Sequence, residues 1–292
     1  MLALIAGTGD LPPALVARLP QRPLICAMRG FAPNLAPDIT FRMEHLGSFL
    51  TDLRARGVTR ICMAGAVRRP QIDPTQIDKA TMPLVPRVQA ALTQGDDGAL
   101  RIIIAIIEEF GFAVVAAHRI APDLLPAPGV RTKIGPTSSH SNDAFSGETC
   151  LVQMGKADSG QACVIRADDV ILREDAHGTD AMLQKLCASA TDDWMSDATA
   201  DLRKEVKKFL SETPDGQGGR AGGILFKAPK PNQDQRADLP LIGLRTVMMA
   251  AKAGLDGIVI EAGGVMVLDL PTVRKVLDAQ GMFLWVRPRG GA

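Results

Sequence analysis

The sequence contains no tyrosine, and aromatic residues of any kind make up only 4% of its 292 residues. Proteins that bind single-stranded nucleic acid stack successive bases on aromatic side chains, so this shortage argues against such a role. Charge argues the same way, because 33 basic and 32 acidic residues leave a formal net charge of +1 and no basic block. We expect no nucleic acid polymer among the partners of this protein.

Other absences exclude further classes of protein. No apolar run approaches the ~20 residues that a membrane-spanning helix needs. The opening MLALIAGTGDLPP lacks the basic segment of a signal peptide. The five cysteines are scattered without a CxxC pair, and none of the four histidines stands in a zinc-binding spacing such as HExxH. The sequence therefore predicts reduced thiols in a cytoplasmic protein, with any membrane contact peripheral.

In the first part of the chain, short apolar runs alternate with segments of helical character. Alternating strands and helices are typical of a parallel sheet in an α/β domain. Residues 121–142 are rich in Pro, Ser and Gly and predict a linker. We place an N-terminal Rossmann-like domain at 1–130 and a second domain at 131–292. The strands expected in the first domain are 2–6, 23–28, 60–66 and 112–118. One helix is expected to begin at Pro12, and two further helices are expected at 47–56 and 97–110.

The second domain is predicted to be a C-terminal α/β domain with a mixed sheet, separated from the first by a cleft. Two strands are expected around a tight turn at 167–169, and a strand, a Gly–Gly turn and a strand are expected within 257–269. Further strands are expected at 224–230 and 282–287. Helices are expected at 143–154, from Gly178, at 196–210, at 241–253 and from Pro271.

A glycine-rich turn follows the first strand. Gly7, Gly9 and Asp10 lie between this strand and the next helix, where bare backbone amides and the helix dipole favour a phosphate. The third glycine of a dinucleotide fingerprint is missing, because Pro12 occupies that position. The residues alone leave phosphate binding and a plain strand–helix turn as equal interpretations, and a nicotinamide oxidoreductase as a weaker one.

Charged side chains are concentrated in LFKAPKPNQDQRADLPLIG, residues 225–243. Lysine and arginine suit phosphate oxygens, and carboxylates suit Mg²⁺ or Mn²⁺. The segment therefore fits phosphoryl-transfer chemistry, in which positioning and charge neutralisation supply most of the rate. The alternative is a solvated loop in which Asp238 caps a helix that starts near Pro240. The residues that carry the first interpretation are Lys227, Lys230, Gln233, Asp234, Arg236 and Asp238.

Two further positions are candidates for the same site. Thr179 and Asp180 open a helix just after Glu174 and Asp175, and helix capping explains them equally well. Glu261 follows a buried strand and precedes a glycine pair, at the strand end where α/β folds bind ligands. A surface acid on a hairpin is the alternative for Glu261.

Several separated motifs resemble one family in the right order along nearly the whole chain. They are IAGTGDLP, MAGAVRRP, GDDGALR, the segment from DSGQACVIR to GTDAML, QDQRADLP and GLDGIVIEAGG. They are similar to motifs of the UDP-2,3-diacylglucosamine pyrophosphatases of lipid A biosynthesis in Gram-negative bacteria. This resemblance is more specific than any single motif.

The resemblance implies a divalent-cation-dependent hydrolysis of UDP-2,3-diacylglucosamine to UMP and 2,3-diacylglucosamine 1-phosphate. Its catalytic aspartate lies in an R-x-DLP motif, which places that role on Asp238 in this chain. On this basis we assign Asp238 and Glu261 to the Mg²⁺ or Mn²⁺ ion. The substrate-binding residues are then Gly7, Gly9, Asp10, Thr179, Asp180, Lys227, Lys230, Gln233 and Arg236.

The chain departs from the family pattern in three places. His177 stands where a glutamate usually precedes GTDAM, Asp234 replaces a glutamate, and the stretch from Leu186 to Gly223 is longer. A non-catalytic protein that binds a sugar nucleotide or lipid therefore stays as an alternative. The diacylated substrate implies contact with the inner membrane surface. The sequence leaves acyl-chain length, the preferred cation and the oligomeric state open, with a homodimer as one alternative.

Overall fold

A computed structural model describes residues 1–187, 202–212, 221–231 and 233–290. The chain divides into two compact units, one of residues 1–122 and 233–239, the other of residues 123–232 and 240–292. The first unit thus takes seven residues from the later half of the chain. Residues 233–239 of the charged segment singled out in the sequence therefore belong to the first unit, whereas the earlier residues of that segment belong to the second.

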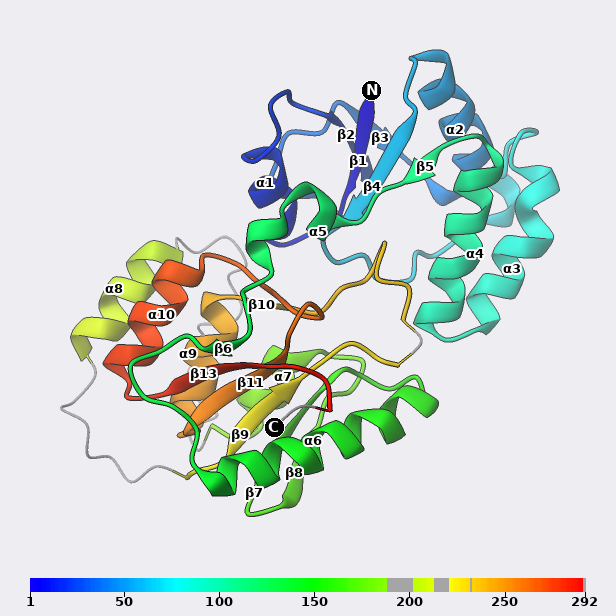
Figure 1. The fold of residues 1–292 in the computed structure, drawn as a ribbon. Coiled ribbons are helices and arrows are strands. Elements are labelled where there is room, and N and C mark those ends of the chain that lie inside the picture. Colours follow the sequence, from blue (N-terminus) through cyan, green and yellow to red (C-terminus); the bar gives the residue numbers. More distant parts are fainter. Residues whose placement is uncertain (188–201, 213–220, 232, 291–292) are drawn as a thin grey trace. The chain divides into compact units, whose positions relative to one another are not determined.

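The first unit is built on a five-stranded sheet in the order β3-β2-β1-β4-β5 (Figure 1). Every neighbouring pair is parallel, which confirms the predicted parallel sheet. The expected strand at 112–118 is much shorter than predicted, because helix α5 begins at Ala117. The strands are β1 (Leu2–Ala6), β2 (Leu24–Met28), β3 (Ile39–Phe41), β4 (Arg60–Ala64) and β5 (Ala113–Val114).

Five α-helices belong to the described part of the first unit. Two of them begin with proline in the first turn, where the missing N–H costs nothing. The longest, α4, begins with Asp96 and Asp97, and its buried Ile106 and Ile107 pack in the core cluster that contains side chains of the sheet. The helices are α1 (Leu11–Val16), α2 (Leu46–Ala55), α3 (Val85–Thr93), α4 (Asp96–Glu109) and α5 (Ala117–Ile120), with 3₁₀ turns at Met43–His45, Pro74–Gln76, Met82–Leu84 and Pro122–Leu124.

The buried carboxylate of Glu44 connects the end of β3 with the loop after β4. Glu44 is only 4% exposed, and its Oε1 accepts from Nη2 of Arg42 at 3.0 Å and from the amide of Asp73 at 2.9 Å. The hydrogen bond from Arg42 is the main cause that lowers the pKa of Glu44 to about 2, against the opposing effect of burial. The charged form of Glu44 is therefore the form that the fold stabilises.

We expect Glu44→Gln to be less stable than the wild type by roughly 2 kcal/mol at neutral pH. The folded pKa of Glu44 lies below its ordinary value of 4.5, so its contribution is complete above that value and is lost as the pH falls towards 2. Urea unfolding at pH 7 and at pH 3 measures the difference between the two proteins. An equal difference at both pH values would contradict the assignment.

The second unit is built on a six-stranded mixed sheet in the order β6-β13-β11-β9-β7-β8. Strands β9, β11 and β13 are parallel, whereas β6, β7 and β8 pair antiparallel, as the predicted mixed sheet requires. The tight turn expected near residue 167 joins β7 to β8. The strands are β6 (Gly129–Val130), β7 (Ala162–Arg166), β8 (Asp169–Arg173), β9 (Ile224–Lys227), β11 (Gly257–Glu261) and β13 (Phe283–Arg287).

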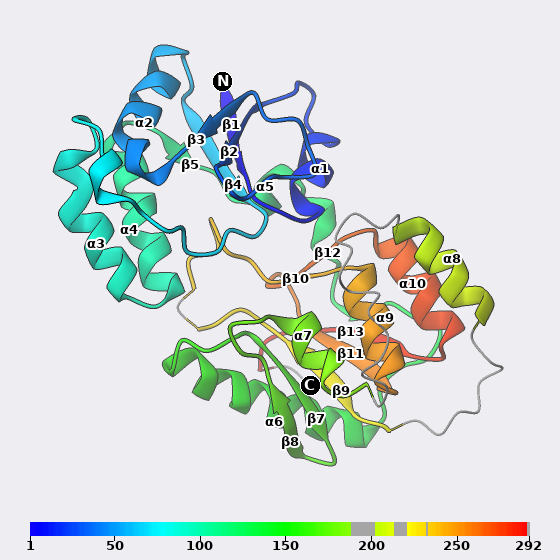
Figure 2. The ribbon, with the colours of Figure 1, turned by 180° about the vertical axis from the view of Figure 1, so that it is seen from behind.

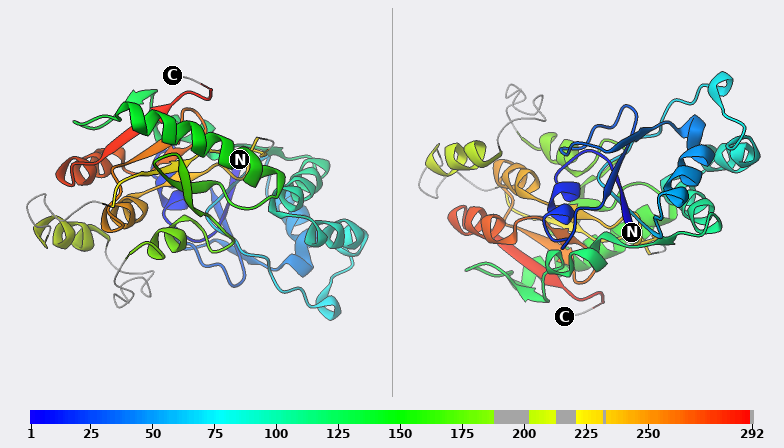
Figure 3. Two further views of the ribbon diagram at one scale, coloured as in Figure 1. Left: turned by 90° about the horizontal axis from the view of Figure 1, so that it is seen from below. Right: turned by 90° about the horizontal axis from the view of Figure 1, so that it is seen from above.

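Helices cover both faces of this sheet. The long helix α6 (Ser138–Lys156) packs on one face, with Phe226, Val259 and Phe283 in its core (Figure 3). Helices α7 (Thr179–Gln184), α9 (Leu244–Lys252) and α10 (Leu270–Ala279) cover the other face (Figure 2). Helix α8 (Leu202–Glu212) packs on α9 and α10. The first residues of the helix expected at 196–210 lie outside the described part of the chain.

The strand, the Gly–Gly turn and the second strand expected within 257–269 are present, but the two strands do not pair with each other as a hairpin. Strand β12 (Met266–Val267) leaves the main sheet and pairs in parallel with β10 (Leu241–Ile242). A strand–glycine–strand pattern does not identify the partner of the second strand. Here the buried side chains of Val265, Met266 and Val267 favour the pairing with β10. Within the described residues, no helix is long and apolar enough to span a membrane.

Candidate functional site

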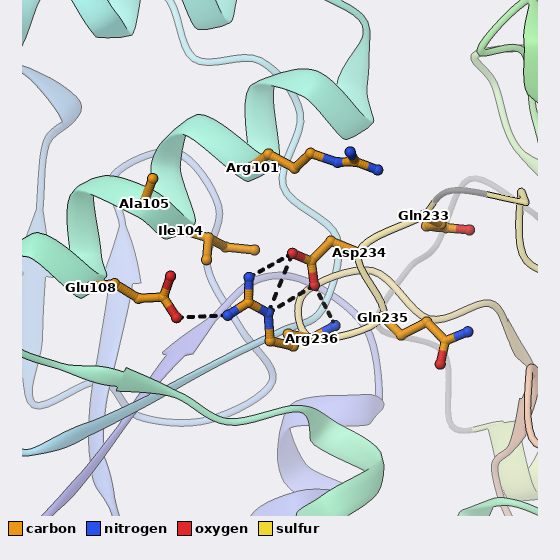
Figure 4. A pocket seen from close by; sticks show the side chains of 8 residues that line it. All are labelled: Arg101, Ile104, Ala105, Glu108, Gln233, Asp234, Gln235 and Arg236. Carbon is orange, nitrogen blue, oxygen red and sulfur yellow. Dashed lines mark hydrogen bonds and ion pairs between the residues drawn. The ribbon is translucent and has the colours of Figure 1, made fainter.

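The charged loop 233–239 packs against helix α4 within the first unit. The amide of Asp234 donates to Oδ1 of Asp97 at 3.1 Å. Arg236 lies between two carboxylates (Figure 4): its Nη2 donates to Oδ2 of Asp234 at 2.8 Å and its Nη1 to Oε1 of Glu108 at 2.6 Å. Arg236 therefore fastens the loop to the helix.

Electrostatics support this fastening. The hydrogen bond from Arg236 is the main cause that lowers the pKa of Asp234, although burial opposes it. The same bond raises the pKa of Arg236 above its ordinary value. Both groups keep their charge at neutral pH, so the ion pair between Arg236 and Asp234 persists there.

Asp238 lies at the end of this loop and is half-buried. Its Oδ2 accepts a hydrogen bond from the amide Nε2 of Gln233, and its backbone amide donates to the carbonyl of Asp234 at 3.3 Å. The next helix, α9, begins at Leu244 with Gly243 in the capping position. Asp238 is not a helix cap, so the alternative interpretation of this residue is wrong. The buried amide of Gln233 instead orients the carboxylate.

A hollow of about 540 Å³ opens beside the loop, within the first unit. The buried side chain of Ile104 and Ala105 form its apolar part (Figure 4). Its polar part comes from α4 and the loop together. The remaining lining residues are Arg101, Glu108, Gln233, Asp234, Gln235 and Arg236.

The glycine turn of the first unit is closed by backbone pairing. The amide of Gly7 donates to the carbonyl of Ala64 at 2.8 Å, and Thr8 and Ala66 exchange two hydrogen bonds of 3.0 and 2.9 Å. Of the three residues expected to bind a phosphate here, Gly7 thus uses its amide within the chain itself. A side chain at Gly7 would meet the carbonyl oxygen of Ala66 at 2.5 Å, which explains why glycine stands there. The carboxylate of Asp10 accepts from the side-chain Nδ2 of Asn34 at 3.1 Å.

We expect Gly7→Ala to destabilise the protein by roughly 3 kcal/mol, because the new methyl group would press on backbone. Gly9→Ala is the matched comparison. Gly9 has a φ of 95° but open space around it. Alanine at this position would therefore incur backbone strain of about 1 kcal/mol without a steric clash. Thermal unfolding ranks the two variants. Equal melting temperatures would show that the close approach of the two loops is not the constraint.

In the second unit, the parallel strands β9, β11 and β13 end at the same edge of the sheet. Lys227 ends β9, and its Nζ donates to Oγ1 of Thr179 at 2.7 Å. Thr179 in turn donates to Oε1 of Glu174 at 2.8 Å. All three side chains are buried. The structure therefore brings together two residues predicted for substrate binding, with Glu174 as a third member.

Glu261 ends β11 but lies on the opposite face of the sheet from Lys227. Lys227 pairs in register with Ile260, so it shares the face of Ile260, and side chains alternate along a strand. Glu261 accepts from Nε of Arg289 at 2.8 Å. Burial raises the pKa of Glu261, whereas Arg289 lowers it. Glu261 and Lys227 are thus not brought together by the sheet that carries them both.

The other predicted residues of the second unit have partners of their own. The ammonium of Lys230 binds Asp158, and Oδ1 of Asp180 accepts from the hydroxyl of Thr246 at 2.9 Å. His177, which departs from the family pattern, is exposed and binds Asp175.

Models of one family match both units of the chain. The LpxI N-terminal domain matches residues 1–124, and the LpxI C-terminal domain matches residues 127–285. The chain belongs to the LpxI family. A relative from Caulobacter vibrioides, UDP-2,3-diacylglucosamine pyrophosphatase LpxI, is 32% identical over 289 residues, covering 97% of this chain and 96% of the relative. The family resemblance inferred from the motifs is confirmed.

This LpxI family member contains site residues that the sequence did not single out. Asp97, Arg101 and Glu108 all lie on α4, where the acidic start of the helix suggested only a helix terminus. Arg69, from MAGAVRRP, binds Oδ1 of Asp96 at 3.1 Å. Three motifs that carried the resemblance, MAGAVRRP, GDDGALR and QDQRADLP, therefore meet in the first unit. The sequence signal that could have identified Asp97, Arg101 and Glu108 was the occurrence of these motifs in the same order as in the family.

The fit of a divalent cation to this LpxI chain depends on very few protein ligands. Among the described residues, no group of three or more His, Cys, Asp or Glu side chains could hold a metal ion. Mg²⁺ commonly takes one or two carboxylates and completes its shell with water and substrate phosphates. The carboxylate of Asp238, oriented by Gln233, fits that requirement, whereas a preformed all-protein metal site is not present in the described part.

Proposed function

We propose that this protein hydrolyses the pyrophosphate bond of UDP-2,3-diacylglucosamine, producing UMP and 2,3-diacylglucosamine 1-phosphate. The observation that carries the proposal is Asp238 at the end of a loop that is fastened to α4 and whose carboxylate is oriented by Gln233. The name of the Caulobacter vibrioides relative, which matches 97% of this chain, supports the same reaction.

In this proposal the carboxylate of Asp238 orients the attacking water or holds a Mg²⁺ or Mn²⁺ ion. The cation supplies charge neutralisation on the pyrophosphate. Gln233 fixes the direction of the carboxylate, and Arg236 keeps the loop in place through Asp234 and Glu108. Lys227, buried and hydrogen-bonded to Thr179, provides positive charge for a phosphate oxygen. Glu261, held by Arg289, is left as a second candidate for the cation.

The substrate class sets the expected location. A diacylated sugar nucleotide has its fatty acyl chains in a membrane, so the enzyme would work in the cytoplasm at the inner membrane surface. A homodimer is compatible with this proposal and is not required by it.

The test is direct assay of the purified protein. Wild-type protein with UDP-2,3-diacylglucosamine and Mg²⁺ should release UMP and 2,3-diacylglucosamine 1-phosphate in equal amounts, measured by chromatography. EDTA should abolish release, and added Mg²⁺ or Mn²⁺ should restore it. Binding of the substrate with no UMP release would instead identify a non-catalytic binding protein. NADH titration serves as the control for the oxidoreductase alternative, and we expect no binding.

A further inference from the structure

Lys227 is a buried ammonium with an indirect counter-charge. The side chains of Lys227, Thr179 and Glu174 are 5%, 6% and 7% exposed. The ammonium reaches the carboxylate only through the hydroxyl of Thr179, by hydrogen bonds of 2.7 and 2.8 Å. A buried charge is costly unless it is paired and hydrogen-bonded, so this arrangement needs a physical reason.

The hydrogen bonds of this group leave the ammonium short of acceptors. The second oxygen of Glu174, Oε2, accepts from the amide of Gln161 at 2.7 Å, which holds the carboxylate in place. An ammonium has three donors, and among the described residues Lys227 uses one of them, towards Thr179. No carboxylate of the described residues accepts directly from Lys227. The remaining donors suit an oxyanion, because charge-assisted hydrogen bonds are the strong ones.

The spacing explains how the positive charge stays available. A carboxylate in direct contact would largely neutralise the ammonium, whereas a carboxylate one hydroxyl away attracts it more weakly. Glu174 thus lowers the free-energy cost of burying Lys227 without accepting a hydrogen bond from its ammonium group. The group also lies at the carboxyl end of β9, beside β11, where the parallel strands of α/β sheets bind ligands.

We propose that Lys227 binds the phosphate monoester of a sugar 1-phosphate, and that Thr179 and Glu174 are positioning residues that orient its ammonium group for it. The proposal rests on the proposed function for the identity of the phosphate, which would be the one that stays with the sugar. It assigns Glu174 a positioning role, because one of its oxygens accepts from Thr179 and the other from the amide of Gln161.

The experiment is calorimetric titration of the full-length protein with glucosamine 1-phosphate, together with UMP-release kinetics. Relative to the wild type, Lys227→Met and Thr179→Val should each weaken binding by about tenfold or more. Thr179→Ser keeps the hydroxyl and should stay within about threefold. Thr81→Val is the matched control. Thr81 is buried to a similar degree, 3% exposed, and its Oγ1 accepts from the amide of Gly47 at 2.9 Å, whereas no lysine of the described residues is hydrogen-bonded to it.

Melting temperatures separate a positioning role from a merely structural one. Thr81→Val and Thr179→Val should both lower the melting temperature, but only Thr179→Val should weaken glucosamine 1-phosphate binding. Equal binding by Thr179→Val, Thr179→Ser and the wild type would overturn the inference, as would the absence of any binding to the wild type. If the wild type binds in the expected order but releases no UMP, the proposed reaction fails while the phosphate site stands.

Discussion

Asp238→Asn is expected to lower the rate of UMP release by roughly a hundredfold or more, with little change in melting temperature. Asparagine has nearly the same shape and can still accept the hydrogen bond from Gln233. It lacks the negative charge that a cation or an attacking water requires. The lower rate of UMP release in this variant therefore measures the effect of the negative charge and not of side-chain packing. Measurement of kcat and KM for UDP-2,3-diacylglucosamine at saturating Mg²⁺ provides the comparison.

Asp169→Asn is the control for Asp238→Asn. Asp169 is exposed at the start of β8, in the tight turn after β7, and should retain wild-type turnover. Turnover of Asp238→Asn within about threefold of the wild type would refute the central role of this carboxylate, because loss of an essential charged group in an active site costs far more. Asp238→Glu addresses geometry, since it keeps the charge but displaces it by one methylene group.

The second large effect is expected for Arg236→Met, which should reduce kcat/KM by about tenfold or more. Arg236 connects Asp234 of the loop with Glu108 of α4, so its loss releases the segment that carries Asp238. If Arg236 acts by fastening the loop, then Glu108→Gln should cause part of the same loss. The double variant should then be less impaired than the product of the two single effects.

A direct phosphate contact by Arg236 gives a different result. In that case Glu108→Gln would leave kcat/KM unchanged, and the two substitutions would act independently. Arg87→Met is the matched control, because Arg87 also pairs with a glutamate of α4, Glu109, away from the loop. Wild-type activity in Arg87→Met would show that loss of an arginine–glutamate pair on this helix is not itself harmful.

Much of the fold follows from local patterns in the sequence. Short apolar runs between glycine and proline turns located β1, β2 and β4, and their alternation with helices predicted the parallel sheet. The paired prolines at the start of α1 and the acidic start of α4 located helix boundaries. These features are encoded within a few residues, so the sequence alone was enough to predict them.

The contacts that define the candidate site were not predictable in this way. Asp234 and Asp97 are 137 residues apart, and Arg236 and Glu108 are 128 residues apart. No periodicity within either segment indicates the other. The same limitation applies to the glycine turn, where the deciding fact is the carbonyl of Ala66 approaching Gly7. Asp238 was located by the resemblance rather than by its local pattern, which favoured a helix cap.

The origin of loop 233–239 also determines when the first unit can be finished. These residues belong to that unit but are synthesised after most of the second one. On the ribosome, the sheet of residues 1–122 can form early, yet Glu108 and Asp97 must wait for Arg236 and Asp234 to emerge. A fragment truncated before Gln233 would thus lack a structural part of its own first half as well as the catalytic aspartate proposed here.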